Sequence, residues 1–285
     1  RARGASRHGS CGLGFNETLE RHFRPEFALT VAQLEDHALP SHLAAIRQSW
    51  VPKRLSQLGF WPLDEEDAGF LNDDNILEHW LDDAAEFLDN VTISDTTNLR
   101  DADVIVFEGA QGLLLDQDRG AFPHVTRSNT GLKNVLALAN ETGIPHLDAY
   151  YVTRAYATRH GAGPLAHELS EPFHMNMSDT TNVPNPWQGA LRFGTLDLSI
   201  LQNAIAHDMT DAMRAPTGVS QHIAVTCLDQ MGLTTSYFEN GYRREVATEE
   251  LADIIANSIA ATTLVTSHGP TRDTVSSTKP RMRTR

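Results

Sequence analysis

In the stretch Val104-Ile105-Val106-Phe107-Glu108-Gly109-Ala110-Gln111-Gly112, a short apolar run leads into a loop that contains two glycines. A continuous apolar run of this length is typical of a strand buried on both faces of a parallel sheet. In open α/β sheets, ligands bind outside the carboxyl ends of such strands. The stretch therefore predicts a buried strand over residues 104–107 and a ligand site in the loop that follows it.

Apolar and helical segments alternate on the C-terminal side of this stretch. Strands are expected over residues 149–153, 223–228 and 264–267, and helical patterns lie near residues 198–214 and 248–261. Strands that alternate with helices are typical of a parallel sheet covered by its crossover helices. The predicted fold class is therefore α/β, with a mostly parallel central sheet flanked by helices.

Residues 34–88, on the N-terminal side, have a mostly helical pattern. Its clearest part is an apolar stripe with helical spacing, formed by Ile76, Leu77, Trp80, Leu81, Ala84, Phe87 and Leu88. No repeat, linker or composition shift marks a domain boundary in the sequence. We expect a single domain over residues 1–275 and a polar, basic, mobile tail over residues 276–285.

The composition excludes several classes of protein. The 285 residues are 40% hydrophobic, enough for one substantial core, and the formal net charge is −14. A protein that binds the nucleic acid backbone needs a concentrated basic surface, so DNA and RNA are not expected partners. Nucleotides remain possible, because a few backbone amides and arginines suffice to bind one phosphate group.

The two cysteines, Cys11 and Cys227, are too few for a disulfide framework or a cysteine-rich zinc site. They fit a reducing compartment. No stretch approaches the roughly 20 apolar residues of a membrane span, and no secretory signal opens the sequence. We therefore expect a cytoplasmic protein without a membrane partner.

Short catalytic motifs are absent from the sequence, which has no Walker loop, no HExxH and no paired CxxC. The 13 histidines are scattered, and no pair has ligand spacing with an acidic third partner, so no metal site is predicted. Asp116 and Asp118 form a pair of carboxylates in a loop. Such a pair is more often a turn or a cap than an acid/base pair.

Three longer stretches are more informative in combination. The first continues the opening loop through Leu114-Leu115-Asp116 to Val125-Thr126-Arg127-Ser128-Asn129-Thr130. The others are Tyr156-Ala157-Thr158-Arg159-His160-Gly161-Ala162-Gly163-Pro164 and Ser267-His268-Gly269-Pro270-Thr271-Arg272. In order and spacing they resemble the adenylosuccinate synthetases, enzymes that join L-aspartate to a 6-oxopurine nucleotide. The resemblance implies a fold related to the P-loop NTPases.

The resemblance also implies a set of residues that bind the purine nucleotide. Gln111 matches a glutamine that contacts the 6-oxopurine nucleotide, and its amide offers both a donor and an acceptor. Thr126 matches a threonine that contacts the phosphate. The other members of this set are Ser10, Cys11, Arg21 and Gly189. Arg21, or alternatively Arg24, matches an arginine that reaches into the partner subunit, which implies a homodimer.

Residues 179–194 correspond to the family's aspartate-binding loop, a threonine pair followed by a run of arginines. The residues implied to bind L-aspartate are Thr180, Thr181, Gln188 and Arg192. Arg192 is the single arginine that remains from the run. The other arginines of the run, which in the family pair with the carboxylates of L-aspartate, are missing from this sequence.

The implied site for the triphosphate donor comprises Asp229, Gln230, Ser267, His268, Gly269 and Pro270. The family's Thr-Lys-Leu-Asp motif reads Thr226-Cys227-Leu228-Asp229 in this chain, without the lysine. Both departures resemble the phage branch of the family, which makes 2-aminoadenylosuccinate from dGMP and L-aspartate on the route to 2-aminoadenine DNA. That branch implies ATP or dATP as the donor and the host cytoplasm as the compartment.

Two further interpretations remain open: a conventional enzyme that acts on IMP with GTP, and a nucleotide-binding protein without catalytic activity. The family's phosphate loop, catalytic aspartate, catalytic histidine and Mg²⁺ contacts precede the position that Gly9 matches. The resemblance therefore implies Mg²⁺ as the cofactor and a chain whose N-terminal catalytic segment is missing. No residue of this sequence is assigned as the general base, and the isolated chain is expected to be inactive.

Overall fold

The computed structural model describes residues 13–171, 177, 179 and 181–281. The described chain forms two compact units, one over Leu13–Asn98 and one that begins at Leu99. The single domain expected over residues 1–275 stays a prediction.

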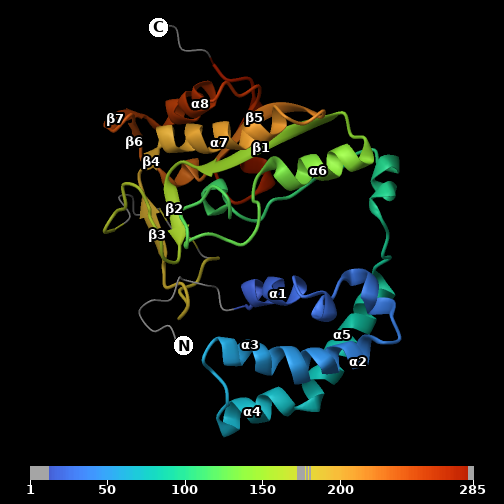
Figure 1. Cartoon of the computed structure of the whole chain (residues 1–285). Helices are drawn as coiled ribbons and strands as arrows, with labels where there is room; N and C mark the ends of the chain where they lie inside the picture. Colours follow the sequence, from blue (N-terminus) through green and yellow to red (C-terminus); the bar gives the residue numbers. More distant parts are fainter. Residues whose placement is uncertain (1–12, 172–176, 178, 180, 282–285) are drawn as a thin grey trace. The chain divides into compact units, whose positions relative to one another are not determined.

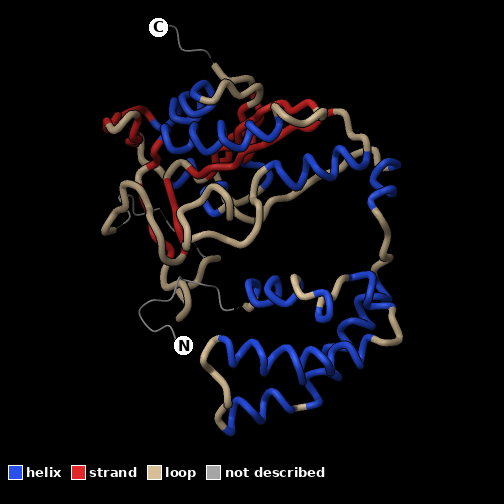
Figure 2. Tube along the Cα trace, in the orientation of Figure 1, coloured by secondary structure: helices blue, strands red, loops and turns tan. Residues whose placement is uncertain are grey.

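The unit over Leu13–Asn98 consists of helices and loops, as the pattern over residues 34–88 predicts (Figure 2). Its α-helices are α1 (Phe15–His22), α2 (Leu39–Ala45), α3 (Val51–Gln57), α4 (Glu65–Asn72) and α5 (Asp74–Asn90). Short 3₁₀ and π segments join them: η2 (Pro25–Phe27), η3 (Val31–Glu35), η4 (Ile46–Trp50) and η5 (Thr96–Asp101), the last of which runs into the second unit.

The predicted apolar stripe lies on α5, and only part of it is covered. Ala84 is buried, whereas Trp80 and Phe87 are 38% and 41% exposed. Asp73 fixes the start of α5, because its carboxylate accepts the backbone N–H of Asn75. Amphipathic spacing therefore predicts the helix correctly, and the neighbouring elements decide how far its apolar face is buried.

The central sheet of the second unit has the order β1-β5-β8-β9. Its strands are β1 (His146–Arg154), β5 (Gly218–Thr226), β8 (Leu264–Ser267) and β9 (Val275–Thr278). β1 pairs with β5 and β5 with β8 in parallel, whereas β9 is antiparallel to β8. The mostly parallel sheet, and the strands expected near residues 149–153, 223–228 and 264–267, are confirmed.

Helices α6 (Leu132–Thr142), α7 (Leu198–Ala212) and α8 (Thr248–Ser258) pack on one face of this sheet (Figure 1). Tyr151 lies opposite Ile223 in the register, so both side chains point to the same face, where Ile205 of α7 joins them in the core. On the other face, Tyr150 and Val152 are 52% and 70% exposed. The α/β class with flanking helices is therefore confirmed.

Short strands extend the second unit beyond the central sheet. β2 (Ala157–His160) pairs with β3 (Leu191–Gly194), and a three-stranded sheet has the order β4-β6-β7. Its strands are β4 (Leu196–Asp197), β6 (Thr234–Glu239) and β7 (Tyr242–Ala247). Asn240 and Gly241 join β6 to β7 with φ values of 51° and 80°. An Asn-Gly pair is suited to this turn because both residues tolerate positive φ.

The strand predicted over residues 104–107 is wrong. These residues have no regular structure, and Val104 and Val106 are 79% and 83% exposed. An apolar run indicates a tendency to be buried, but a strand also needs a neighbour that pairs with its backbone, and no described strand pairs with this segment. The tail predicted from residue 276 is also corrected, because residues 276–278 belong to β9.

Candidate functional site

A long loop over residues 108–131, called the 108–131 loop below, carries the first of the three family-like stretches. Asp116 lies at its centre and is 3% exposed. One carboxylate oxygen of Asp116 accepts the backbone N–H of Asp118 at 2.8 Å, and the other accepts the backbone N–H of Thr130 at 2.7 Å. The interpretation of Asp116 as a turn residue is thereby confirmed, since the carboxylate closes the loop on itself.

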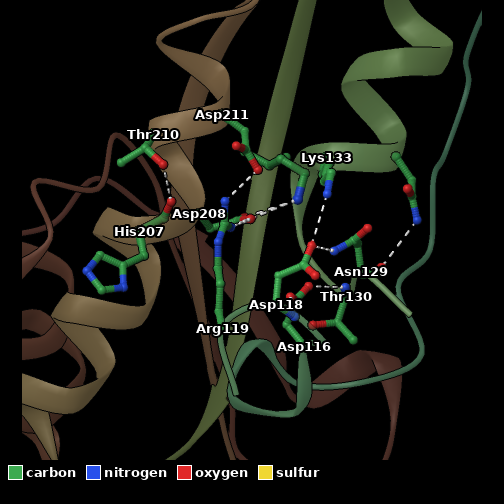
Figure 3. Close-up of polar contacts among 12 residues, drawn as sticks. Asp116, Asp118, Arg119, Asn129, Thr130, Lys133, His207, Asp208, Thr210 and Asp211 are labelled. Carbon is green, nitrogen blue, oxygen red and sulfur yellow. Dashed lines mark hydrogen bonds and ion pairs between the residues drawn. The ribbon is translucent and has the colours of Figure 1, made fainter. Parts of the chain in front are cut away.

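Asp208 of α7 fastens this loop to the core. It is 1% exposed and accepts hydrogen bonds from the Tyr151 hydroxyl at 2.9 Å and the Leu132 backbone N–H at 3.0 Å. Arg119, in the loop, donates from Nη1 to Oδ1 of Asp208 at 2.9 Å. Burial, followed by the negative charge of Asp208, raises the pKa of Tyr151 well above its usual range. Figure 3 shows Arg119 extending toward both Asp208 and Asp211.

Two more ion pairs surround this connection. Arg119 donates from Nη2 to Asp211 at 2.6 Å, and Lys133 contacts Asp118 at 2.9 Å. Burial alone would lower the pKa of Arg119, but the hydrogen bond and charge of Asp211 raise it. The cavity among these groups has a volume of about 80 Å³. Ligand sites enclose about 300–1,000 Å³, so the cluster holds the loop and is too small to bind a nucleotide.

Gln111 and Thr126, two of the implied nucleotide contacts, both lie in the 108–131 loop. Gln111 is exposed, Thr126 is half-buried, and neither the amide nor the hydroxyl bonds to a residue that the structure describes. The backbone N–H of Thr126 donates to the Leu115 carbonyl at 2.8 Å, which fixes its position. The structure therefore brings the two implied nucleotide contacts into one fastened loop with their side chains available.

Arg192, the single arginine of the segment that matches the family's aspartate-binding loop, is engaged within the protein. Its Nε donates to Glu168 at 2.6 Å, and its Nη2 contacts the second oxygen of the same carboxylate. Nη1 donates to the carbonyls of Gly161 and Gly163 at 3.0 and 2.9 Å. The hydrogen bond that Arg192 donates to Glu168, together with the negative charge of Glu168, raises the pKa of Arg192. In this structure the guanidinium has its carboxylate partner in Glu168.

Gln188 and Gly189, two other implied residues of this segment, lie in a tight turn. Gly189 has a φ of 74°, and its carbonyl accepts from Nε2 of His160 at 3.1 Å. The backbone N–H of Gln188 donates to Oδ1 of Asn185 at 2.8 Å. Thr180 lies outside the described residues. The turn around Gly189 is thus fixed to the strand that carries His160.

Thr181 is held by a carboxylate that sequence reasoning did not select. Asp179, whose side chain is 5% exposed, accepts the backbone N–H and the hydroxyl of Thr181 at 2.9 and 2.7 Å. It also pairs with Arg154, the last residue of β1, at 2.7 Å. Burial acts to raise the pKa of Asp179, but the hydrogen bonds from Thr181 and Arg154 hold it well below its usual range.

The residues implied to bind the triphosphate donor meet at the carboxyl ends of β5 and β8, which are adjacent and parallel. Asp229 and Gln230 belong to η7 (Leu228–Gln230) directly after β5. The Tyr156 hydroxyl donates to Oε1 of Gln230 at 2.5 Å. Burial is the main cause that raises the pKa of Tyr156 to about 12. This edge is where an open parallel sheet binds its ligand.

On the β8 side of this edge, a compact turn continues from the strand. The Ser267 hydroxyl donates to the Gly269 carbonyl at 3.0 Å, and the His268 backbone N–H donates to the Thr274 carbonyl at 3.0 Å. Pro270 follows in the turn and leads into η8 (Arg272–Thr274). The fold therefore brings together all the residues implied to bind the triphosphate donor.

The structure gives no placement of three implied nucleotide contacts relative to this site. Ser10 and Cys11 lie outside the described residues. Arg21 belongs to α1 in the other unit, where its Nη1 donates to the Phe27 carbonyl at 2.6 Å. Burial lowers the pKa of Arg21. The role of Arg21 across a dimer interface stays a prediction.

Sequence reasoning missed Asp208, although a signal for it exists. Residues Leu198, Ile205 and Ala212 form the buried stripe of α7, and Asp208 lies at helical spacing within this stripe. A carboxylate on an otherwise apolar stripe must find buried donors, because an unpaired buried charge is strongly disfavoured. Asp179 and Arg154 carry no comparable signal, since they meet only in the fold.

The fold is that of an α/β protein with loops at the carboxyl ends of its parallel strands. A model of the adenylosuccinate synthetase family matches residues 1–264, and the chain belongs to this family. No helix among the described residues is long and apolar enough to cross a membrane.

The chain is similar to adenylosuccinate synthetases known from their sequences and to one of known structure. An adenylosuccinate synthetase of Mesoplasma florum is 28% identical over 214 residues, which is 72% of this chain and 46% of that protein. One from Stenotrophomonas maltophilia is 32% identical over 145 residues, 50% of this chain and 33% of that protein. The chain thus spans less than half the length of these relatives.

A solved structure supports the fold. The fully ligated adenylosuccinate synthetase of Plasmodium falciparum superposes with a TM-score of 0.67 at 15% identity, over 96% of this chain and 71% of that one. At this identity the likeness concerns the fold alone. It agrees with the parallel sheet and flanking helices described above.

Proposed function

We propose that this chain is part of a C–N ligase that joins L-aspartate to C6 of a purine nucleotide, with dGMP as the nucleotide. The observation that supports it most is the 108–131 loop. It is fastened by Asp116 and Asp208, and it offers the Gln111 amide and the Thr126 hydroxyl without a described partner. A preorganised amide and hydroxyl suit a purine ring and its phosphate.

The reaction has two steps. The terminal phosphoryl group of a nucleoside triphosphate is transferred to the purine O6, and the amine of L-aspartate then attacks C6 and displaces inorganic phosphate. The contribution of this chain is to bind the nucleotide through Gln111 and Thr126 and the donor through the residues that follow β5 and β8. The family uses Mg²⁺ and GTP in general. Among the described residues no group of three metal-ligating side chains converges, so we assign no step to a metal held by them.

Two departures from the family support dGMP and an adenine donor over IMP and GTP. The segment that matches the aspartate-binding loop keeps only Arg192, and this arginine is paired with Glu168. Cys227 stands where the family has a donor-site lysine, and it has a φ of 60°. A site built for a deoxynucleotide has one hydroxyl fewer to satisfy, and an unpaired buried polar group is unfavourable by about 1–3 kcal/mol.

The test is an assay of the 285-residue chain, and of the protein encoded by its complete reading frame, with L-aspartate and Mg²⁺. ATP, dATP and GTP are each tested as donors against dGMP and IMP. Formation of 2-aminoadenylosuccinate from dGMP supports the proposal. Formation of adenylosuccinate from IMP alone indicates the conventional enzyme. Nucleotide binding without turnover by the complete protein indicates a binding protein and contradicts the proposed ligase.

A further inference from the structure

Two arginines lie opposite each other in the β2–β3 pair, and their surroundings differ. Arg159 of β2 is the register partner of Arg192 of β3. The positive charge of Arg192 is balanced by Glu168, which contacts both Nε and Nη2. Because Glu168 already occupies Nε and Nη2, Arg192 is poorly suited to hold a carboxylate of L-aspartate as well.

Among the described residues, the hydrogen-bond partners of Arg159 are all neutral. Its Nε donates to the Ala162 carbonyl at 2.9 Å, and its Nη2 donates to the His124 carbonyl at 2.8 Å. No carboxylate of the described residues forms an ion pair with it. Burial and the charge of Arg192 lower its pKa, whereas a carboxylate neighbour would raise it. A partly buried guanidinium next to a like charge, without an anion, is an unusual arrangement that a bound anion would stabilise.

Part of the Arg159 guanidinium has no hydrogen-bond partner among the described residues. The two N–H groups on Nη1 and one on Nη2 remain after the two carbonyl contacts. The Nη1–Nη2 edge of a guanidinium matches the two oxygens of a carboxylate or phosphate. Gly163 makes room for the Arg159 guanidinium because glycine has no side chain. A Cβ at residue 163 would lie 2.5 Å from Nη2 of Arg159 and 2.6 Å from Cβ of His124.

The location of Arg159 connects two parts of the proposed site. His124, whose carbonyl it contacts, precedes Thr126 in the 108–131 loop. The next residue in β2, His160, contacts the carbonyl of Gly189 in the segment that matches the aspartate-binding loop. Arg159 therefore lies between the proposed phosphate contact and the segment from which the arginines are missing.

We propose that Arg159 binds an oxyanion of a substrate through its Nη1–Nη2 edge, either a carboxylate of L-aspartate or the phosphate of the purine nucleotide. This inference rests on the proposed function, because the oxyanion belongs to one of its substrates. Arg159 would supply the charged contact that Arg192, held by Glu168, does not.

The experiment is calorimetric titration of the 285-residue chain with dGMP, with IMP, and with L-aspartate in the presence of saturating nucleotide. Wild type is compared with Arg159→Gln and Arg159→Lys. Since hydrogen bonds to a charged group are strong, we expect Arg159→Gln to weaken binding about 10- to 100-fold. Arg159→Lys keeps the charge but loses the bidentate edge, so it restores only part of the affinity. A loss confined to L-aspartate assigns the carboxylate, and a loss in nucleotide binding assigns the phosphate.

Arg243→Gln is the matched control, because Arg243 is an exposed residue of β7 outside the proposed site. Melting temperatures are measured for every variant. A lower melting temperature of Arg159→Gln with unchanged ligand affinity would mean that Arg159 only anchors the His124 carbonyl, and would overturn the inference. Full affinity in Arg159→Lys would overturn it too. If wild type binds neither nucleotide nor L-aspartate, the proposed function itself fails, which is a different result from a binding-competent wild type with an unaffected variant.

Discussion

Gly131 leaves no room for a side chain beside Asp208, since a Cβ at residue 131 would lie 1.9 Å from Oδ1 of Asp208. This close approach lets the carboxylate of Asp208 accept the backbone N–H of Leu132 at the start of α6. A single buried side chain of α7 thus holds both Arg119 of the 108–131 loop and the first residue of the next helix.

Gly131→Ala is expected to lower the free energy of unfolding by about 1–3 kcal/mol, the range for overpacking a tight interior. The methyl group displaces the Asp208 carboxylate from its donors. Urea denaturation monitored by circular dichroism measures the change. Gly112→Ala, in the same loop and with no atom within 4 Å of the added carbon, is the control. Equal effects of the two variants would contradict the proposed crowding.

Asp208→Asn is expected to destabilise the protein by about 3 kcal/mol, because it removes the charge that Arg119 and the Tyr151 hydroxyl share. Asp211 also pairs with Arg119, but its side chain is 21% exposed against 1% for Asp208. Asp211→Asn should therefore have the smaller effect. The comparison uses chemical denaturation of both variants, and a larger loss in Asp211→Asn would show that Asp208 is not the central contact.

Acid stability is expected to depend on Asp179. Its pKa in the folded protein is depressed by the hydrogen bonds from Thr181 and Arg154, against the opposing effect of burial. The unfolded chain, with an Asp pKa of about 3.9, therefore binds the proton more readily than the folded protein does. The stabilisation is fully present at neutral pH and is lost as the pH falls below about 4.

The measurement is the melting temperature between pH 7 and pH 3. Wild type should lose stability more steeply in the acid range than Asp179→Asn, which cannot ionise at this position. Asp82→Asn on α5 is the matched control and should follow the wild-type profile. Parallel profiles for wild type and Asp179→Asn would disprove the contribution of Asp179.

Gln111→Ala is expected to weaken purine nucleotide binding by up to about tenfold, the usual contribution of a neutral hydrogen bond. Its melting temperature should stay unchanged, because the amide makes no bond within the described structure. Calorimetric titration with dGMP and IMP provides the measurement. Gln117→Ala in the same loop is the control, since the Gln117 amide contacts Asn129 instead. Unchanged affinity in Gln111→Ala would remove Gln111 from the proposed site.

The central strands and helices are predictable because each buries a regularly spaced apolar face. β8 runs over the predicted residues 264–267, and α7 begins at the predicted residue 198. The apolar run over residues 104–107 carries the same signal yet forms no strand, because pairing depends on a neighbour that a local pattern does not report. The β6–β7 hairpin is not among the predicted strands, although its Asn240-Gly241 turn is a local signal.

The site was predictable only in part. Family resemblance selects Gln111 and Thr126, and the fold places both in one loop. Resemblance also selects Arg192, but the ion pair with Glu168 joins residues that are distant in sequence and becomes visible only in the fold. Whether the selected residues bind substrates stays a prediction.

The contact between Leu132 and Asp208 also makes the Leu132 amide a probe of whether the 108–131 loop is docked. An amide at the start of a helix normally has no partner within that helix and exchanges its hydrogen with solvent quickly. The Leu132 N–H instead donates to a buried carboxylate, at 3.0 Å to Oδ1 and 3.2 Å to Oδ2. Its hydrogen–deuterium exchange is therefore slow only while the loop is docked, so this one amide measures how often the loop opens in solution.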